Sequence, residues 1–492
     1  MLRPGRNCLL VSRAESGVIV DACDYFRAVA DAIESARTMV LITGWQLDTR
    51  VVLRRDAGED PNEHTLAAVL KRACARSPEL EVRVLPWDWS PVYTIDREWA
   101  TAARLEEIAD GRVHCVWDAA HPAGASQHEK MVLIDGHTAF VGGIDLCDSR
   151  WDDRHHLPAD PRRVDLDGEP YGPYHDVQAV VRGEVVHELV KVFVDRWARA
   201  GGAPFSPRIA PTPREPPWCH HPIAPAEVAI VRTRPADPRD GRPEIRELEQ
   251  LMTDAIAAAE SHVYIETQYL TSHAMGQALV QRLRDTSRPR LEIVVLLPRR
   301  TEGRLERAAV ANPQRVMLHA LRRTADANGH RFGVYCPAME PSAEHAESEK
   351  APPITYVHSK LCVVDDRILV IGSANLTNRS MGFDSELCLA WCTERPDASL
   401  RAIRLALLSE HIAISPDDAE EVIGEVRGLV AKLDALTCID AAQLVAHSFV
   451  DQPDDPSVLD DVFAEIGDPA RADDLGERAA HVMERLGDAV LR

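Results

Sequence analysis

The chain has 492 residues, 45% of them hydrophobic, so it can bury more than one core and we expect two or three domains. Its 56 basic and 78 acidic residues give a net charge of -22, which argues against a protein that binds nucleic acid through excess positive charge. No apolar run approaches the roughly 18 residues of a membrane-spanning helix, no secretion signal is recognisable, and the eleven cysteines form no Cys-x-x-Cys pair. We therefore expect a monomeric, cytoplasmic protein with reduced thiols that can meet a membrane only peripherally.

The order of predicted elements repeats along the chain. Helical spacing around residues 26–33 leads into a strand-like run at 39–43, and a helical stretch at 66–70 leads into a strand at 82–85. Residues 203–225 contain eight prolines and are predicted to be a linker. After the linker the same order returns, with helical spacing over 245–256, a strand at 262–265, a helix at 279–283 and a strand at 291–297. Near-continuous apolar strands that alternate with helices predict an α/β fold with two similar halves, residues 1–202 and 226–410, each built on a mixed, mainly parallel sheet flanked by helices.

The last part of the chain, residues 411–492, differs in charge. It holds 19 acidic and 6 basic residues, so more than half of the net negative charge lies there. Its apolar residues keep helical spacing, which predicts an acidic helical C-terminal extension rather than a disordered tail.

Each half contains one His-x-Lys-x-x-x-x-Asp segment. The two motifs are His128, Lys130 and Asp135 in the first half and His358, Lys360 and Asp365 in the second. A pair of small residues begins seven positions after each aspartate, at Gly142-Gly143 and at Gly372-Ser373. Two matches with corresponding flanks in a repeat indicate a functional site rather than chance.

The spacing within each motif has a physical reading. Residues two apart in a strand face the same side, so the histidine and lysine of each motif project together. The four apolar residues that follow are predicted to continue the strand into the core. The small residues beyond allow close backbone approach and could offer N–H donors to an anion. Few lysines occur in the chain, six in all, and two of them lie in these motifs.

These motifs resemble those of the phospholipase D superfamily, whose members carry two His-Lys-Asp motifs in one active site. The similarity extends over residues 5–410. Flanking segments that resemble the lipid-acting branch are Gly44-Trp45, Gly142 to Cys147 with Arg150-Trp151-Asp152, Tyr264 to Tyr269, and Gly372 to Asn375 with Asn378-Arg379-Ser380. The resemblance implies that the two halves pack face to face and build a single site.

The resemblance also implies roles for residues. One imidazole attacks phosphorus and another protonates the leaving alkoxide, which needs neither a metal nor a cofactor. His128 is then the nucleophile, through a phosphohistidine intermediate, and His358 is the general acid and later the base. Lys130, Lys360 and Asn375 are expected to bind phosphate, with Ser373, Gly143 and Gln268 completing the substrate-binding set.

The acidic residues fall into three groups. Asp145 stands where many relatives have asparagine, so we include it in the substrate site as an orienting group, because a carboxylate repels phosphate. Asp176 and Glu386 each open an apolar strand and are similar to the family's histidine partners, with the pairing left open. Asp135 and Asp365 complete the catalytic motifs, but their positions favour a structural role at strand ends and turns.

Other conspicuous residues are expected to be structural. The tryptophans Trp45, Trp87 and Trp89 and the cysteine Cys362 are predicted to lie in the core. The cluster Cys219, His220 and His221 is half of a metal site at most, so no metal site is predicted there. Head-group selection is expected on loops such as residues 271–275 and 312–317.

The leading hypothesis is a phospholipase D-type phosphodiesterase that cleaves glycerophospholipids at a membrane surface, with water or an alcohol as acceptor. The alternatives are a cardiolipin-synthase-like transferase, disfavoured because no amino-terminal membrane helices are found, and a nuclease, disfavoured by the charge. A non-catalytic binding protein on the same scaffold is disfavoured by the two intact motifs.

Overall fold

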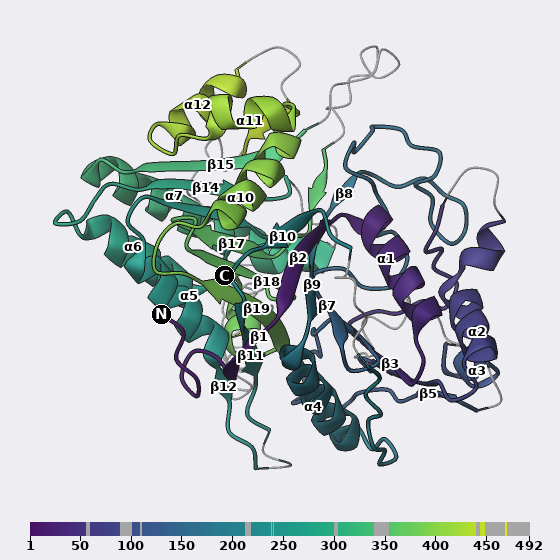
Figure 1. Ribbon diagram of the computed structural model, residues 1–492. Helices are drawn as coiled ribbons and strands as arrows, with labels where there is room; N and C mark the ends of the chain where they lie inside the picture. The colour runs from purple at the N-terminus through teal and green to yellow at the C-terminus, as the bar shows by residue number, and fades with distance from the viewer. Residues whose placement is uncertain are drawn as a thin grey trace, which may run out of the picture.

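The fold was examined in a computed structural model that describes residues 1–55, 60–88, 101–108, 111–211, 218–237, 239, 241–299, 304–338, 354–438, 443–447 and 468–469, with the backbone alone for 304–309. The chain forms two halves, each a large twisted sheet with helices, which lie side by side in Figure 1. Two short strands, β8 (Tyr174–His175) and β16 (Tyr356–Val357), come from different halves and pair with each other. The α/β class with two similar halves is therefore confirmed.

The sheet of the first half has eight strands. In spatial order they are β10 (His221–Ile223), β2 (Glu15–Val20), β9 (Val177–Arg182), β7 (Thr138–Gly142), β6 (Met131–Ile134), β3 (Met39–Gly44), β4 (Glu81–Pro86) and β5 (Val113–Cys115). Its helices are α1 (Ala22–Ser35), α2 (Leu66–Arg76), α3 (Thr101–Glu106) and α4 (Glu184–Arg199), with the short 3-10 helix η1 (Pro61–His64).

The sheet of the second half has ten strands. Along its main path they are β1 (Leu10–Arg13), β11 (Glu227–Arg234), β19 (Glu386–Cys392), β18 (Ile368–Gly372), β17 (Leu361–Val364), β13 (His262–Glu266), β14 (Glu292–Leu296), β15 (Arg331–Pro337) and β20 (Leu444–Ala446), while β12 (Ile245–Arg246) pairs with β11. Its helices are α5 (Glu247–Ala258), α6 (His273–Arg284), α7 (Arg304–Asn328), α9 (Asn378–Gly382), α10 (Ala398–His411), α11 (Pro416–Ile423) and α12 (Leu429–Leu436).

The expectation of mainly parallel sheets is wrong. Within the two large sheets, parallel pairing is confined to β3, β4 and β5 in the first half and to β13, β14 and β15 in the second, each set being parallel among its own members. The strand within each motif, β6 or β17, returns through a tight turn into β7 or β18, and such a short connection forces antiparallel pairing. Both faces of each sheet are nevertheless buried, so the strands keep the continuous apolar character that suggested parallel pairing.

Three short strands cross the boundaries expected from the sequence. β1 lies in the first 202 residues but pairs with β11 of the second sheet, and β10 lies in the proline-rich segment but pairs with β2 of the first. The C-terminal region contains α11 and α12 as expected, but it also contributes β20 to the edge of the second sheet. These exchanges tie the halves to each other through backbone hydrogen bonds.

The largest core cluster lies between the two halves. It contains residues of β7 and β9, such as Val141 and Val181, together with Leu369, Leu389 and Trp391 of the second sheet. Residues of α4 and α10 belong to the same cluster, so burial of one continuous apolar region holds the halves in register. Within the described part of the chain, no helix has the length and hydropathy to cross a bilayer.

Candidate active site

The two motifs meet at the interface between the halves. The residue before His128 bridges to Ser385 of the other half, and the His128 backbone N–H donates to the Ser385 carbonyl over 2.9 Å. In the same way, the His358 backbone N–H donates to the His175 carbonyl of the first half over 2.8 Å. Each catalytic candidate is thus fixed by the backbone of the opposite half, immediately beside the strand that follows it.

Each of these histidines is paired with a carboxylate from the other half. His128 Nδ1 lies 3.0 Å from Glu386 Oε2, and His358 Nδ1 lies 2.6 Å from Asp176 Oδ2. Both carboxylate side chains are about 1% exposed. This geometry answers the pairing that the sequence left open: each carboxylate contacts Nδ1 of the histidine from the opposite half, so Nε2 of each ring is the nitrogen available to a substrate.

The two motif lysines have different surroundings. Lys130 Nζ lies 3.0 Å from Asp145 Oδ2, and both side chains are only 2% exposed. The other oxygen of Asp145 accepts a hydrogen bond from the backbone N–H of Trp45. Asp145 therefore contacts a motif lysine and the backbone at Trp45, and its role as an orienting group stays a prediction.

Lys360 is held by neutral groups instead. Its ammonium donates to the His358 carbonyl and lies 3.5 Å from Gln268 Oε1, which also accepts from Asn375 Nδ2 at 3.1 Å. Gln268 donates in turn to the hydroxyls of Tyr269 and Tyr356. Gln268, Asn375 and Lys360, which the sequence assigned to substrate binding, therefore form one polar group.

Burial and charge shift the protonation of the second motif. Burial, and then the positive charges of Lys360, Arg150 and Lys130, hold the pKa of His358 well below its usual value. Burial raises the pKa of Asp176 to about 6. The pKa of Glu386 behaves differently: burial would raise it, but the neighbouring His128 and hydrogen bonds from His128 and Ser373 outweigh burial and lower it. Glu386, in the pair with His128, is therefore an ionised carboxylate. His358, in the pair with Asp176, is a neutral imidazole.

Gly143 and Ser373 occupy corresponding positions in the two halves. Each contacts a buried carboxylate, so neither lines a space that is open to phosphate. A Cβ atom on Gly143 would lie 2.2 Å from Asp176 Oδ1, so only glycine allows this carboxylate to approach. The Ser373 hydroxyl donates to Glu386. The expectation that the backbone N–H groups of these residues bind an anion is wrong, because they donate to the carbonyls of Val177 and Leu387 in the sheets.

Asp135 and Asp365 lie at the far ends of the motif strands. Seven residues separate each from its histidine, or roughly 20 Å in extended chain. Asp135 accepts the backbone N–H groups of Arg37, Thr38 and Met39 at the start of β3. Asp365 accepts those of residues 260–262 at the start of β13 in the same arrangement. Both aspartates hold one strand start against a turn and contribute no side chain to the site, which matches the structural role that their positions favoured.

Several aromatic residues at the site were not predicted from the sequence. Trp45 was expected in the core, but it is half-buried, with its ring 6.3 Å from that of His128 in an edge-on arrangement. Tyr174 and Tyr356 stack on each other, and their ring centroids lie 5.3 and 6.4 Å from that of His358. A sequence signal existed, since each tyrosine lies two residues before a site residue, Asp176 or His358. Trp87 is buried as expected, and Trp89 lies outside the described residues.

Other expected features can also be placed. His220 accepts from the Val20 N–H and pairs with Asp24, which gives it a structural role, and Cys362 lies in the core. The proposed head-group loops are largely helical instead: α6 begins at His273, and residues 312–317 lie within α7. Their polar residues resembled loops because Ser272 caps α6 and Pro313 interrupts the pattern of α7.

Comparisons with known proteins agree with this geometry. The family model described as "Phospholipase D" matches residues 32–210, and the one described as "Cardiolipin synthase, PLD-like domain" matches residues 252–401. The chain is 27% identical to phospholipase D A of Dictyostelium discoideum over 75% of its own length and 32% of that protein. It is 24% identical to phospholipase D alpha 1 of Vigna unguiculata over 82% of its own length and 66% of that protein, so it spans less than two thirds of either relative.

A solved structure shows the same fold. The phosphatidylserine synthase of Haemophilus influenzae Rd KW20 superposes with a TM-score of 0.52 at 13% identity, covering 86% of this chain and 94% of that one. Both halves of the chain, each with its His-Lys-Asp motif, are thus matched by models of one superfamily. The chain belongs to the phospholipase D superfamily of enzymes.

Proposed function

We propose that the protein is a phospholipase D-type phosphodiesterase that cleaves the head group from glycerophospholipids through a phosphohistidine intermediate. The observation that carries this proposal is the pair of histidine–carboxylate contacts across the interface, each with a motif lysine beside it. Two imidazoles can divide the work of nucleophile and acid, and two ammonium groups can hold the charge of one phosphodiester.

In the first step, His128 Nε2 attacks phosphorus while the bond from phosphorus to the head-group oxygen breaks. The Nδ1–H of His128 donates to Glu386, which keeps Nε2 unprotonated and stabilises the positive charge that develops on the ring. His358 gives its Nε2 proton to the leaving alkoxide. In the second step, His358 takes a proton from water or an alcohol, whose oxygen attacks phosphorus and releases His128.

His358 must carry a proton in the complex, although its pKa is lowered in the free protein. Part of that lowering comes from the positive charges of Lys360, Arg150 and Lys130. A bound phosphodiester anion offsets these charges, so the pKa of His358 rises when substrate binds. Binding of the anion thereby prepares the general acid.

The substrate contacts divide between the halves. Lys130, oriented by Asp145, and Lys360, beside Gln268 and Asn375, bind the non-bridging phosphate oxygens. The stacked Tyr174 and Tyr356 shield His358 from water. The phospholipases D of Dictyostelium discoideum and Vigna unguiculata support a phospholipid substrate. We propose that the protein meets this substrate peripherally, at the inner face of the cytoplasmic membrane.

Transfer to a second lipid is the other candidate reaction. The match of residues 252–401 to a model described as "Cardiolipin synthase, PLD-like domain" favours it. The same intermediate serves both reactions, because only the acceptor that attacks it differs.

The proposal is tested with vesicles of phosphatidylcholine and phosphatidylglycerol in buffer with ethanol, analysed by mass spectrometry. Phosphatidylethanol together with phosphatidate is the expected result. If cardiolipin is the main product, the protein is a transferase that joins two lipids rather than a hydrolase. No product from either lipid, with folded protein, would overturn the proposal.

The lowered pKa of Lys360 predicts how this activity depends on pH. Its pKa is lowered to about 7, chiefly by burial; Asp176 and Glu386 oppose the shift, while Lys130 and Arg150 add to it. The ammonium form is present below pH 7 and lost above it, so kcat/KM is expected to fall about tenfold per pH unit on the alkaline side. The measurement is a pH profile of kcat/KM for phosphatidylcholine.

The control for this prediction is Lys360→Arg, whose guanidinium stays charged at all accessible pH values. Its activity is expected to be lower, and its pH profile should lose the decline that deprotonation of Lys360 contributes, so that only deprotonation of the general acid His358 remains on the alkaline side. The same limb in the variant and in the unaltered protein would assign the pH dependence to another group.

A further inference from the structure

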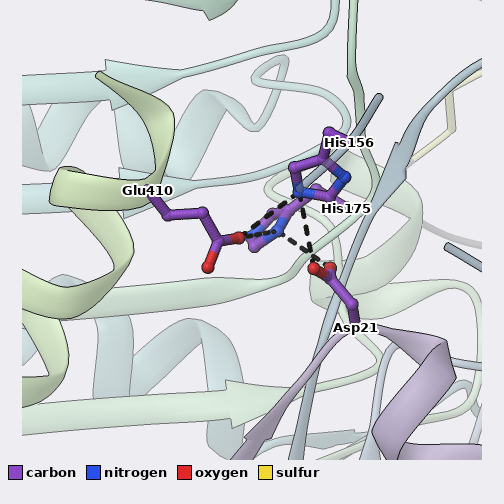
Figure 2. A group of neighbouring side chains, drawn as sticks. All are labelled: Asp21, His156, His175 and Glu410. Atoms are coloured by element: carbon purple, nitrogen blue, oxygen red, sulfur yellow. Dashed lines mark hydrogen bonds and ion pairs between the residues drawn. The ribbon is translucent and has the colours of Figure 1, made fainter. Parts of the chain in front are cut away.

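A second cluster of histidines and carboxylates is buried behind the active site, where four parts of the chain meet. Asp21 lies between β2 and α1, His156 in the loop after β7, His175 on β8 and Glu410 in the last turn of α10. Figure 2 shows their polar atoms converging on one point, with Glu410 from the second half and the other three from the first. None of these residues takes part in the chemistry described above.

Four nitrogen–oxygen distances within the cluster, in which each oxygen of Asp21 faces one histidine, are close to the edge length of a coordination tetrahedron. His175 Nδ1 lies 3.0 Å from Asp21 Oδ1 and 3.2 Å from Glu410 Oε1. His156 Nε2 lies 3.4 Å from Asp21 Oδ2 and 3.3 Å from Glu410 Oε1. Zinc–ligand bonds of 2.0 to 2.1 Å in a tetrahedron place ligand atoms about 3.3 Å apart.

The outer nitrogen of each imidazole is held by a further carboxylate. His156 Nδ1 lies 2.9 Å from Asp152 Oδ2, and His175 Nε2 lies 3.1 Å from Glu266 Oε2. This carboxylate–histidine pattern is the one that orients metal-ligating imidazoles. Apart from the contacts within the cluster given above, the inner nitrogen of His175 and the oxygen Asp21 Oδ2 have no hydrogen-bond partner among the described residues, although both side chains are completely buried.

The charged side chains around the cluster do not balance one another, and two further positive charges are needed. Four carboxylates surround the imidazoles, Asp21, Asp152, Glu266 and Glu410. Among the described residues, Arg163 pairs with Asp152 and Arg154 with Glu410, which compensates two of the four. One divalent cation would balance the two remaining negative charges while the inner nitrogens of both histidines stay unprotonated.

Local geometry at the ligands points the same way. Asp21 precedes α1 at its N-cap with φ 61° but makes no side-chain capping bond, so its carboxylate turns from the helix toward the histidines. Glu410 lies at the C-terminal end of α10, where the helix dipole disfavours a negative charge. The position of Glu410 is unfavourable for a carboxylate unless nearby positive charge compensates it.

We propose that Asp21, His156, His175 and Glu410 bind one divalent transition-metal ion, for which Zn²⁺ is the best fit. Two imidazoles and two carboxylates suit such an ion better than Mg²⁺ or Ca²⁺, which prefer oxygen ligands alone. The ion is structural: it joins α10 of the second half to β8 of the first. It also positions the site, because His175 precedes Asp176, and the Asp176 N–H donates to Asp21 Oδ1.

The proposal is tested on the full chain, purified without a polyhistidine tag from medium containing trace metals. Inductively coupled plasma mass spectrometry is expected to find about one Zn²⁺ per chain after dialysis. Protein produced with Co²⁺ in place of Zn²⁺ is expected to show visible ligand-field bands of a four-coordinate site. Neither measurement uses a substrate, so the result is independent of the proposed function.

The variant His156→Gln is expected to lose most of the bound metal and to unfold at a lower temperature. Its matched control is His262→Gln, which removes a buried histidine paired with Asp366 in the second half and should keep the metal. The proposal would be overturned if the unaltered protein held no stoichiometric metal, or if His156→Gln held as much metal as the unaltered protein. The two histidines would then balance the carboxylates as imidazolium ions. If His156→Gln does not fold, the metal content and Co²⁺ spectrum of the unaltered chain decide alone.

Discussion

Replacing His128 by asparagine is expected to reduce phospholipid cleavage by at least about 10,000-fold, because the proposed covalent step loses its nucleophile. Asparagine is smaller than histidine and can still hydrogen-bond to Glu386, so the interface between the halves should remain intact. The remaining lysines can bind the phosphodiester but cannot attack it. The measurement is the initial rate of phosphatidate and phosphatidylethanol formation from phosphatidylcholine vesicles.

The control for this variant is His187→Ala, which removes an exposed histidine on α4 and should leave the rate unchanged. Acid quenching of the unaltered enzyme with phosphorus-labelled lipid should place the label on the peptide that contains His128. Activity within tenfold of the unaltered protein would exclude His128 from the chemistry. Label on the peptide of His358 would exchange the roles of the two histidines.

Replacing Glu386 by glutamine is expected to lower the rate by an amount on the order of 10,000-fold, the loss seen when a catalytic imidazole is left in the wrong tautomer. The carboxylate accepts the Nδ1–H of His128, which leaves Nε2 free to attack. A glutamine amide can donate its own N–H to Nδ1 instead, and the ring proton then moves to Nε2. The imidazole keeps its place but loses the lone pair that reacts.

The matched control is Glu247→Gln, the same change in the same half, at a largely buried glutamate that pairs with Arg232. Glu247 lies outside the site, because its carboxylate contacts Arg232 of β11 rather than a motif residue, so the rate of this variant should stay close to that of the unaltered protein. Thermal unfolding of both variants checks that each is folded. A rate for Glu386→Gln equal to that of the control would remove Glu386 from the mechanism.

Much of the local structure could be predicted from the sequence. The strands expected at residues 39–43, 82–85, 262–265 and 291–297 correspond to β3, β4, β13 and β14. Strands buried on both faces leave continuous apolar runs, which is why their positions could be read. The sheet direction could not be read in the same way, since it depends on the turns that follow the motifs.

The site was predictable where its residues share a local pattern. The histidine and lysine of each motif are two residues apart, immediately before β6 or β17, so their closeness in the chain keeps them together. The roles of Gly143 and Ser373 were not predictable, because what they touch, Asp176 and Glu386, lies elsewhere in the chain. The aromatic residues around the histidines were missed for the same reason.

The sequence by itself determined the reactive groups of this protein: two imidazoles and two ammonium groups, in matching places of a repeat. Only the tertiary structure decided which carboxylate serves which histidine, because the partners are 258 and 182 residues apart and belong to opposite halves. The buried cluster of Asp21, His156, His175 and Glu410 has no spacing that marks it in the chain. Contacts within a strand follow from backbone geometry, whereas contacts between halves depend on how two cores pack.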